Sequence, residues 1–422
     1  IQSDGRARLS SEAFRELMGD SMLVTSSVMD HVVTHLDGDA LSKCALTCRA
    51  WRDLIQSDDH VWATCARQDF GLSSPITPPR VVGEGGLGTG SSFREAWLAW
   101  RTEFAEFFEE DGDAEVLKKT ARIFNELRAW LGENEPAILA TLRPGMSREE
   151  LATAMSANQL SLPASVRAMY RVCDGQDDSK VTLKFDMSRG ADNWIGLFGG
   201  YSFYDNVVNL RFLNLPRACS LHALCRDKEA FDDKFPFACS FQWAKDVMPE
   251  RTMLVGLSTG DVLSMGGTGQ QQGHLLHPSG GAGLLGWLET FFGRLRAGYF
   301  RKAKLIKDLE HSVGISLFPR GGEYACENVT RGVRVRASSL FVPEMCRGLQ
   351  RYFYAYSIRF RLLRPLDPSD GGATSCQLLS RHFTFTRWAP GGPREEDRVD
   401  GEAVIGMYPL LRCAEGAEGG GR

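Results

Sequence analysis

Residues 24–62 read VTSSVMDHVVTHLDGDALSKCALTCRAWRDLIQSDDHVW, and this stretch decides the fold of the N-terminal region. Its apolar side chains recur at the spacing of three short amphipathic helices, carried by Val28, Val32 and Leu36, then Leu41, Cys44, Ala45 and Cys48, then Trp51, Leu54 and Ile55. About forty residues are too few to bury a core alone. The uncovered apolar faces therefore predict a docking module that a partner protein completes.

The same stretch resembles the F-box. Its centre reads Cys48-Arg49-Ala50-Trp51-Arg52, where the family has Cys-Arg-x-Trp-Arg, while Val24-Thr25 replaces the Leu-Pro start. The resemblance implies that the stretch binds a Skp-type adaptor; an ordinary small helical subdomain is the alternative. We expect the adaptor surface, or its immediate support, at Val24, Val28, Val32, Leu36, Leu41, Leu46 and Trp51.

Composition bounds the class of protein. A chain of 422 residues is long enough for about two to four domains, and 43% hydrophobic with 24% charged residues is typical of a soluble globular protein. The net charge of −4 argues against a general binder of nucleic acid or of anionic membranes. Eleven cysteines at scattered spacing favour reduced thiols and a cytoplasmic or nuclear location. Because residue 1 is Ile, without an initiator Met, we expect a fragment.

Residues 71–109 are predicted to be a linker followed by a packing helix. Residues 71–92 are rich in Gly, Pro and Ser, which favours a flexible linker. A phosphate-binding loop at 83–90 is disfavoured because the Gly-Lys-Ser/Thr ending is missing. Residues 93–108 then return to helical spacing, with aromatic side chains at Trp97, Trp100, Phe104 and Phe107.

Residues 110–300 are predicted to form an α+β domain. Helices are expected at 116–131, after the capping-box pair Ser147 and Glu150, at 163–173 and at 284–295, with Gly175 ending the third. Strand patterns occupy 195–204, 253–257 and 262–263. This region resembles the SUKH superfamily in Leu162-Pro163, Tyr170, Asp174-Gly175 and the run 195–201. The resemblance implies a protein-binding module without shared catalytic residues.

Residues 315–422 change to a period of two, which predicts an all-β sandwich. The region resembles ApaG, an immunoglobulin-like domain, in the runs 351–356, 378–383 and 404–409. Gly401, Ala403 and Gly406 occupy the frame of its glycine motif, which favours a tight turn over dinucleotide binding. Because the chain ends in CAEGAEGGGR, we expect an incomplete or divergent sandwich.

Candidate chemical sites are weak. His31 and His35 lie one helical turn apart and are expected to be solvated. Cys219, His222 and Cys225 have no evident fourth ligand, so core thiols are favoured over a zinc site. We therefore expect no catalytic residue, no cofactor and no metal.

The order F-box, SUKH, ApaG resembles that of the F-box-only family with these three domains, and of its plant and algal Skp-interacting members. The expected fold is multidomain: an all-α F-box at 20–70, the linker and helix at 71–109, the SUKH-like α+β domain at 110–300 and the ApaG-like sandwich at 315–422. The resemblance implies a non-catalytic substrate receptor of an SCF (Skp–cullin–F-box) ubiquitin ligase, acting in protein degradation, with no nucleic acid or membrane partner. The alternatives are an F-box scaffold outside ligases, and a phosphate or nucleotide sensor using Arg351, Arg359 and Arg361.

Overall fold

The computed structural model of the chain describes residues 36–413, except 48, 79–88, 110–111, 178, 181–193, 205, 226–230, 242–247, 267–273, 276–282, 307–308, 310, 347–351, 366–372 and 405–406. The chain divides into two compact units. Unit 1 comprises residues up to 136 and 143–174, and unit 2 comprises 137–142 and the residues from 175 onward. These units are defined by packing and not by family, so they do not test the predicted domain boundaries, which stay a prediction.

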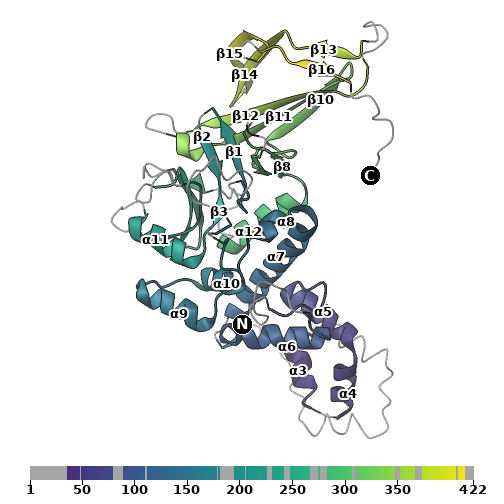
Figure 1. Ribbon diagram of the computed structural model, residues 1–422, viewed down its shortest axis with the longest axis vertical. Helices are drawn as coiled ribbons and strands as arrows, with labels where there is room; N and C mark the ends of the chain where they lie inside the picture. Colours follow the sequence, from purple (N-terminus) through teal and green to yellow (C-terminus); the bar gives the residue numbers. More distant parts are fainter. Residues whose placement is uncertain are drawn as a thin grey trace. The chain divides into compact units, whose positions relative to one another are not determined.

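Unit 1 is helical in its described part (Figure 1). Its elements are α3 (Gly38–Cys44), α4 (Arg49–Ser57), α5 (Asp59–Phe70), α6 (Phe93–Glu103), η1 (Ala105–Phe108), α7 (Asp113–Asn134), α9 (Arg148–Ala157) and α10 (Ala164–Val172). Local sequence signals begin these helices. Asp37, Asp58 and Ser92 accept hydrogen bonds from first-turn N–H groups of α3, α5 and α6. The predicted capping box at Ser147 and Glu150 is confirmed, with both of its hydrogen bonds present.

Aromatic side chains form the core of the first part of unit 1. Trp62, Trp97 and Trp100 are almost completely buried, and the Trp62 and Trp97 rings lie 5.3 Å apart. The predicted aromatic face of 93–108 is therefore confirmed as core. The start of the predicted linker packs against the helices, contrary to the expectation of a flexible segment. Leu72 is buried, and the indole N–H of Trp100 donates to the carbonyl of Ile76 at 3.0 Å. Its middle, 79–88, lies outside the described residues.

The second predicted helix is shorter than the apolar stripe suggested. Helix α3 ends at Cys44 because the N–H groups of Leu46 and Thr47 bond to carbonyls three residues back, at 3.1 and 3.0 Å. Residues 45–47 form a turn before α4. The first predicted helix lies mostly outside the described residues, since these begin at Leu36.

The first part of unit 2 contains α8 (Pro136–Leu139), which begins one residue before the unit does, and helices α11 (Leu215–Cys225) and α12 (Gly283–Arg296). It also contains two sheets. One sheet has the order β2 (Asn206–Asn209), β1 (Gly200–Phe203), β9 (Val313–Ser316), β8 (Arg301–Lys304). The other is antiparallel in the order β3 (Arg211–Phe212), β4 (Lys234–Cys239), β5 (Arg251–Gly256), β6 (Val262–Gly266), β7 (His274–Leu275). The strand patterns predicted at 253–257 and 262–263 are confirmed, because Val255 of β5 pairs with Val262 of β6 across a turn. The predicted final helix is confirmed as α12.

Two predictions in this region were wrong in detail. The strand expected at 195–204 is limited to β1, because Gly199 takes a φ of +71° and the N–H of Gly196 bonds to the side chain of Asn209 at 3.0 Å. Gly175 does not end α10, whose C-cap is Cys173. It is required instead by its φ of +68° and by the backbone of Leu213, which a Cβ would meet at 2.4 Å.

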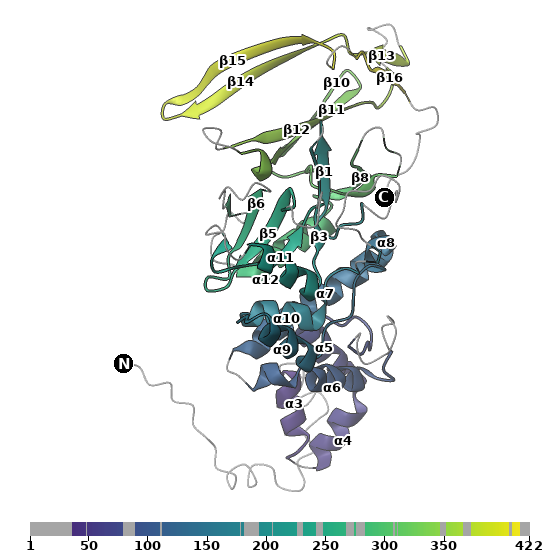
Figure 2. The same ribbon diagram turned by 60° about the vertical axis from the view of Figure 1, so that its left-hand side comes forward.

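The C-terminal part of unit 2 consists mainly of strands, as predicted, with one short 3-10 helix, η4 (Pro343–Met345). One antiparallel sheet has the order β10 (Ala325–Thr330), β11 (Val333–Phe341), β12 (Tyr354–Leu362). Two strand pairs follow, β13 (Ser375–Gln377) with β16 (Leu410–Arg412), and β14 (Ser380–Ala389) with β15 (Gly392–Glu402). In Figure 1 and Figure 2 the β14–β15 hairpin faces β12, and the rings of Tyr356 and Phe383 lie 5.9 Å apart. The predicted multidomain layout, from helical N-terminus to β-rich C-terminus, is confirmed.

Candidate functional site

The predicted docking residues take different positions in the structure. Leu41 is completely buried, Leu36 and Trp51 are half-buried, and Leu46 is 77% exposed. Val24, Val28 and Val32 lie outside the described residues. In this conformation Leu41 supports the helices, whereas Leu46 offers an apolar side chain to solvent. The assignment of all seven residues to an adaptor surface or its support stays a prediction.

Helix α3 is fixed on α5 and α6, which explains the burial of Leu41. The side chain of Trp97 fills the place where a Cβ on Gly38 would stand, at 2.1 Å, so only glycine permits this close approach. The guanidinium of Arg101 pairs with Asp39 at 3.0 Å. Because α3 is held from two sides, the turn that follows it is also placed.

The turn carrying Leu46 has a fixed backbone and a free apolar side chain. The N–H of Leu46 donates to the carbonyl of Lys43, and Nε of Arg52 in α4 donates to the carbonyl of Ala45 at 3.2 Å. Single exposed leucines are common on monomeric proteins, so the exposure of Leu46 alone does not identify a binding surface. A leucine held in solvent by a rigid turn, within a docking-module sequence, loses little conformational entropy when a partner covers it.

The buried polar groups beneath these helices are structural. Burial, with the charge of Asp69 adding to it, raises the pKa of Cys65 from 9.0 to about 12, so its thiol is neutral. Asp69 accepts from the indole N–H of Trp97 at 2.8 Å and pairs with Lys118 at 3.2 Å. Asp69 thus joins α5 to α6 and α7.

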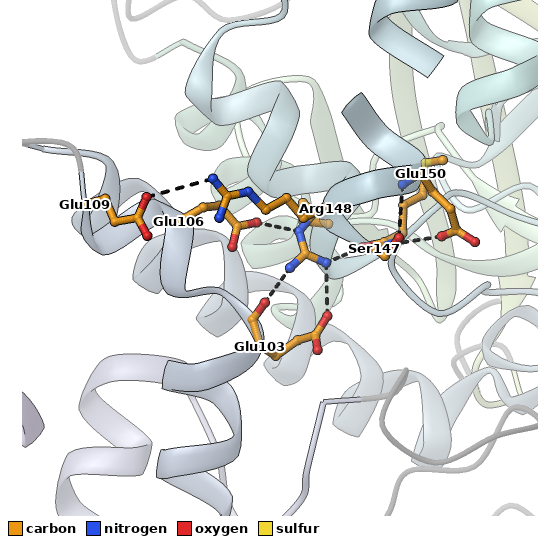
Figure 3. Close-up of polar contacts among 8 residues, drawn as sticks. Glu103, Glu106, Glu109, Ser147, Arg148 and Glu150 are labelled. Carbon is orange, nitrogen blue, oxygen red and sulfur yellow. Dashed lines mark hydrogen bonds and ion pairs between the residues drawn. The ribbon is translucent and has the colours of Figure 1, made fainter. Parts of the chain in front are cut away.

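A buried arginine, Arg171, ties the packing helix to the helices that follow, and Figure 3 labels its partners Glu103 and Glu106. Nε of Arg171 in α10 donates to Glu106 at 2.7 Å, and its Nη1 bonds to Glu103 at 3.1 Å. The same guanidinium also donates to the carbonyls of Met146 and Glu103. At the edge of the cluster, Arg148 lies 3.9 Å from Glu109. The hydrogen bonds of Arg171 thus satisfy its buried charge, and they join α10 to α6, to η1 and to the residues just before α9.

The C-terminal strands expose aromatic side chains. Tyr352, which precedes β12, and Tyr354 and Tyr356 on β12 are all more than half exposed, as is Phe385 on β14. On the opposite face of the sheet, register pairs Arg336 with Arg359 and Arg334 with Arg361. Among the described residues, Glu327 is the carboxylate that pairs with Arg334 and Arg336. Burial lowers the pKa of Arg359, and Arg351 lies outside the described residues.

The other candidate sites gain no support as chemical sites. Cys219 and Cys225 are buried in α11, and the ring of His222 lies 5.7 Å from that of Phe235. The described residues contain no group of three or more His, Cys, Asp or Glu side chains placed to hold a metal ion. None of the described helices combines the length and hydropathy needed to cross a bilayer. His31 and His35 lie outside the described residues.

Comparison with known protein families finds one match near each end of the chain. Residues 26–68 match the family described as F-box-like, and residues 346–417 match the ApaG domain. F-box protein SKIP16 of Arabidopsis thaliana is 30% identical over 381 residues, which cover 85% of this chain and 79% of that protein.

Two further relatives match less of their own length. F-box only protein 3 of Mus musculus is 21% identical over 328 residues, 74% of this chain and 58% of that protein. Protein ApaG of Xanthomonas oryzae pv. oryzae is 37% identical over 65 residues, 15% of this chain and 42% of that protein.

Proposed function

This chain belongs to the F-box protein family, and from that membership we propose that it is the substrate-recognition subunit of an SCF ubiquitin ligase. The F-box docks a Skp-type adaptor and, through it, a cullin–RING ligase. The SUKH-like region and the ApaG domain bind the protein to be ubiquitinated. The observation that carries the proposal is the F-box-like match at 26–68, within a chain similar to SKIP16 over most of its length.

The geometry of the N-terminal helices supports the docking role. The turn bearing Leu46 is held by backbone hydrogen bonds while its side chain stays in solvent. The predicted first helix, with Val28 and Val32, would extend the apolar surface. A rigid, apolar and incomplete surface is what a partner subunit covers at least cost in conformational entropy.

The exposed aromatic strip on β12 and β14 supports substrate binding by the C-terminal strands. Aromatic side chains are enriched in the energetically dominant parts of protein interfaces. The SUKH resemblance of residues 110–300 adds a second predicted protein-binding surface. Holding a substrate near a charged conjugating enzyme raises its effective concentration, so this subunit needs no catalytic residue of its own.

A cytoplasmic or nuclear location follows from the same proposal. None of the ten cysteines in the described part of the chain forms a disulfide bond. Free buried thiols are typical of reducing compartments.

Affinity purification of the full chain from cells with the proteasome inhibited tests the proposal. We expect adaptor and cullin to co-purify with the intact chain, and both to be lost on deletion of residues 1–70. Val28→Asp combined with Val32→Asp should also abolish adaptor recovery, because a charge buried in an apolar interface costs several kcal/mol, on the order of a thousandfold in affinity. Recovery of adaptor without cullin would instead support the scaffold alternative.

The arginines of β11 and β12 favour one second candidate, an anion-binding role. Arg336 lies opposite Arg359 and Arg334 opposite Arg361, and like charges directly opposite destabilise a sheet. Glu327 pairs with Arg334 and Arg336, so an added anion would neutralise chiefly Arg359 and Arg361. Calorimetric titration of the full chain with ATP and with inorganic phosphate tests this role. Binding that Arg361→Gln abolishes would support a phosphate or nucleotide sensor, and no heat of binding would remove this candidate.

A further inference from the structure

Unit 2 contains a cavity of about 350 Å³, and Tyr352 and Tyr354 of the exposed aromatic strip lie at its edge. Its lining includes residues of α12, β5, β11 and β12, together with Tyr299 and Phe300. Most of the lining is aromatic or aliphatic, including Phe198, Trp287, Phe291, Phe341 and Tyr354. A volume near 300 Å³ is at the lower end of the range for sites that bind small ligands or a few residues of peptide. The cavity is therefore large enough for a side chain with its terminal group.

Arg251 contributes a buried positive charge to this cavity. Arg251 is only 4% exposed, and its guanidinium donates from Nε to Ser264 at 2.9 Å and from Nη1 to the hydroxyl of Tyr201 at 3.2 Å. Its Nη2 has no partner among the described residues. Glu344 accepts from the Tyr201 hydroxyl, so Arg251 reaches the nearest carboxylate of this network only through that hydroxyl.

Arg294 contributes a second positive charge. It lies in the last turn of α12, with its guanidinium 5.1 Å from the centre of the Tyr299 ring. Within the described residues no carboxylate lies within ion-pair distance of it, and the lining residues include no Asp or Glu. A mostly apolar cavity lined by two arginines and by no Asp or Glu is electrostatically complementary to an apolar ligand that carries a negative charge.

We propose that this cavity binds an apolar or aromatic group that ends in a carboxylate, such as the C-terminal residue of a target protein. The aromatic walls bury the apolar part, and the free Nη2 of Arg251 with the guanidinium of Arg294 binds the carboxylate. A monoanionic carboxylate fits better than a phosphate, because a buried dianion with three acceptor oxygens needs more donors than this apolar lining provides. Only the assignment of the ligand to a target protein rests on the proposed ligase function.

Calorimetric titration of the full chain tests the site. The probes are acetyl-Ala-Ala-Ala-Phe with a free carboxylate, the same peptide as its C-terminal amide, 3-phenylpropionate and phenyl phosphate. We expect the acid to bind about tenfold or more tightly than the amide, the size of one charge-assisted hydrogen bond. Arg294→Gln should weaken the acid by a similar factor. Arg296→Gln, on the same helix but outside the cavity, is the matched control and should change affinity less than about twofold.

Each outcome decides the proposal. Equal affinity for acid and amide, no binding of either, or tighter binding of phenyl phosphate would overturn it. If 3-phenylpropionate binds as tightly as the peptide and Arg294→Gln weakens both, the carboxylate site stands and its natural ligand is a free carboxylate. Adaptor binding is measured separately, so failure of the cavity proposal leaves the ligase proposal intact.

Discussion

Leu46→Asp separates docking from folding more sharply than any other substitution in the described part of the F-box. Because Leu46 is 77% exposed, the free chain gains little from its side chain, and we expect the free energy of unfolding to change by less than about 0.5 kcal/mol. Complete burial of a leucine is worth about 1.5–3 kcal/mol, so covering the exposed three-quarters contributes about 1–2 kcal/mol to adaptor binding. An aspartate in an apolar contact adds an unfavourable contribution of at least similar size. The sum predicts an affinity loss of about a hundredfold.

Calorimetric titration with a purified Skp-type adaptor measures this loss, and urea unfolding of the same protein measures stability. Leu41→Asp is the contrasting variant. Leu41 is completely buried, so its replacement should destabilise the N-terminal helices by several kcal/mol and reduce binding only through unfolding. Leu379→Asp, at a leucine 64% exposed in unit 2, is the control for the chemical change and should leave adaptor affinity unaltered. Wild-type affinity in a folded Leu46→Asp protein would refute the reasoning.

Three further predictions test the packing. Arg171→Met should destabilise unit 1 by about 3–5 kcal/mol, because it leaves Glu103 and Glu106 without their buried partner. Arg148→Met, at the exposed edge of the cluster, is the control and should change the melting temperature little. Equal shifts of the melting temperature in the two variants would contradict the central role of Arg171. The raised pKa of Cys65 means that the folded state holds the thiol proton more tightly than the unfolded state. Its stability contribution is complete below pH 9.0 and is lost as the pH rises toward about 12, by up to about 1.4 kcal/mol per pH unit. The melting temperature of unit 1 should fall over that range, with a smaller slope in Cys65→Ala; identical slopes would argue against the shift. Gly175→Ala should cost more than Gly260→Ala in chemical denaturation, because both need a positive φ but only the first Cβ meets backbone, and a larger loss for Gly260→Ala would reverse this ranking.

Local patterns predicted the elements of the fold well where neighbouring residues decide them. The capping box at Ser147 and Glu150 and the turn between β5 and β6 depend on residues a few positions apart, so the sequence alone indicates them. The F-box and ApaG resemblances were confirmed by the family matches at 26–68 and 346–417. The SUKH resemblance stays a prediction.

Contacts between distant residues escaped sequence reasoning. Arg171 lies 68 positions from Glu103, and no spacing rule connects them. The residues that line the cavity extend from Phe198 to Tyr354 along the chain, so the sequence does not show that Arg251 and Arg294 lie close together. Periodicity placed Leu41 on an apolar stripe, and Leu46 was expected beside it at the adaptor surface or its support. Only the packing against α5 and α6 decides which of the two side chains is buried.

Hydrogen–deuterium exchange of the full chain, with and without a purified Skp-type adaptor, tests the central claim most directly. That claim is an N-terminal helical surface completed by the adaptor. The account predicts slower exchange on adaptor addition in residues 24–55, centred on the turn that carries Leu46, and unchanged exchange in β10–β16. Binding that protects the C-terminal strands while leaving residues 24–55 unchanged, or no protection anywhere, would contradict it.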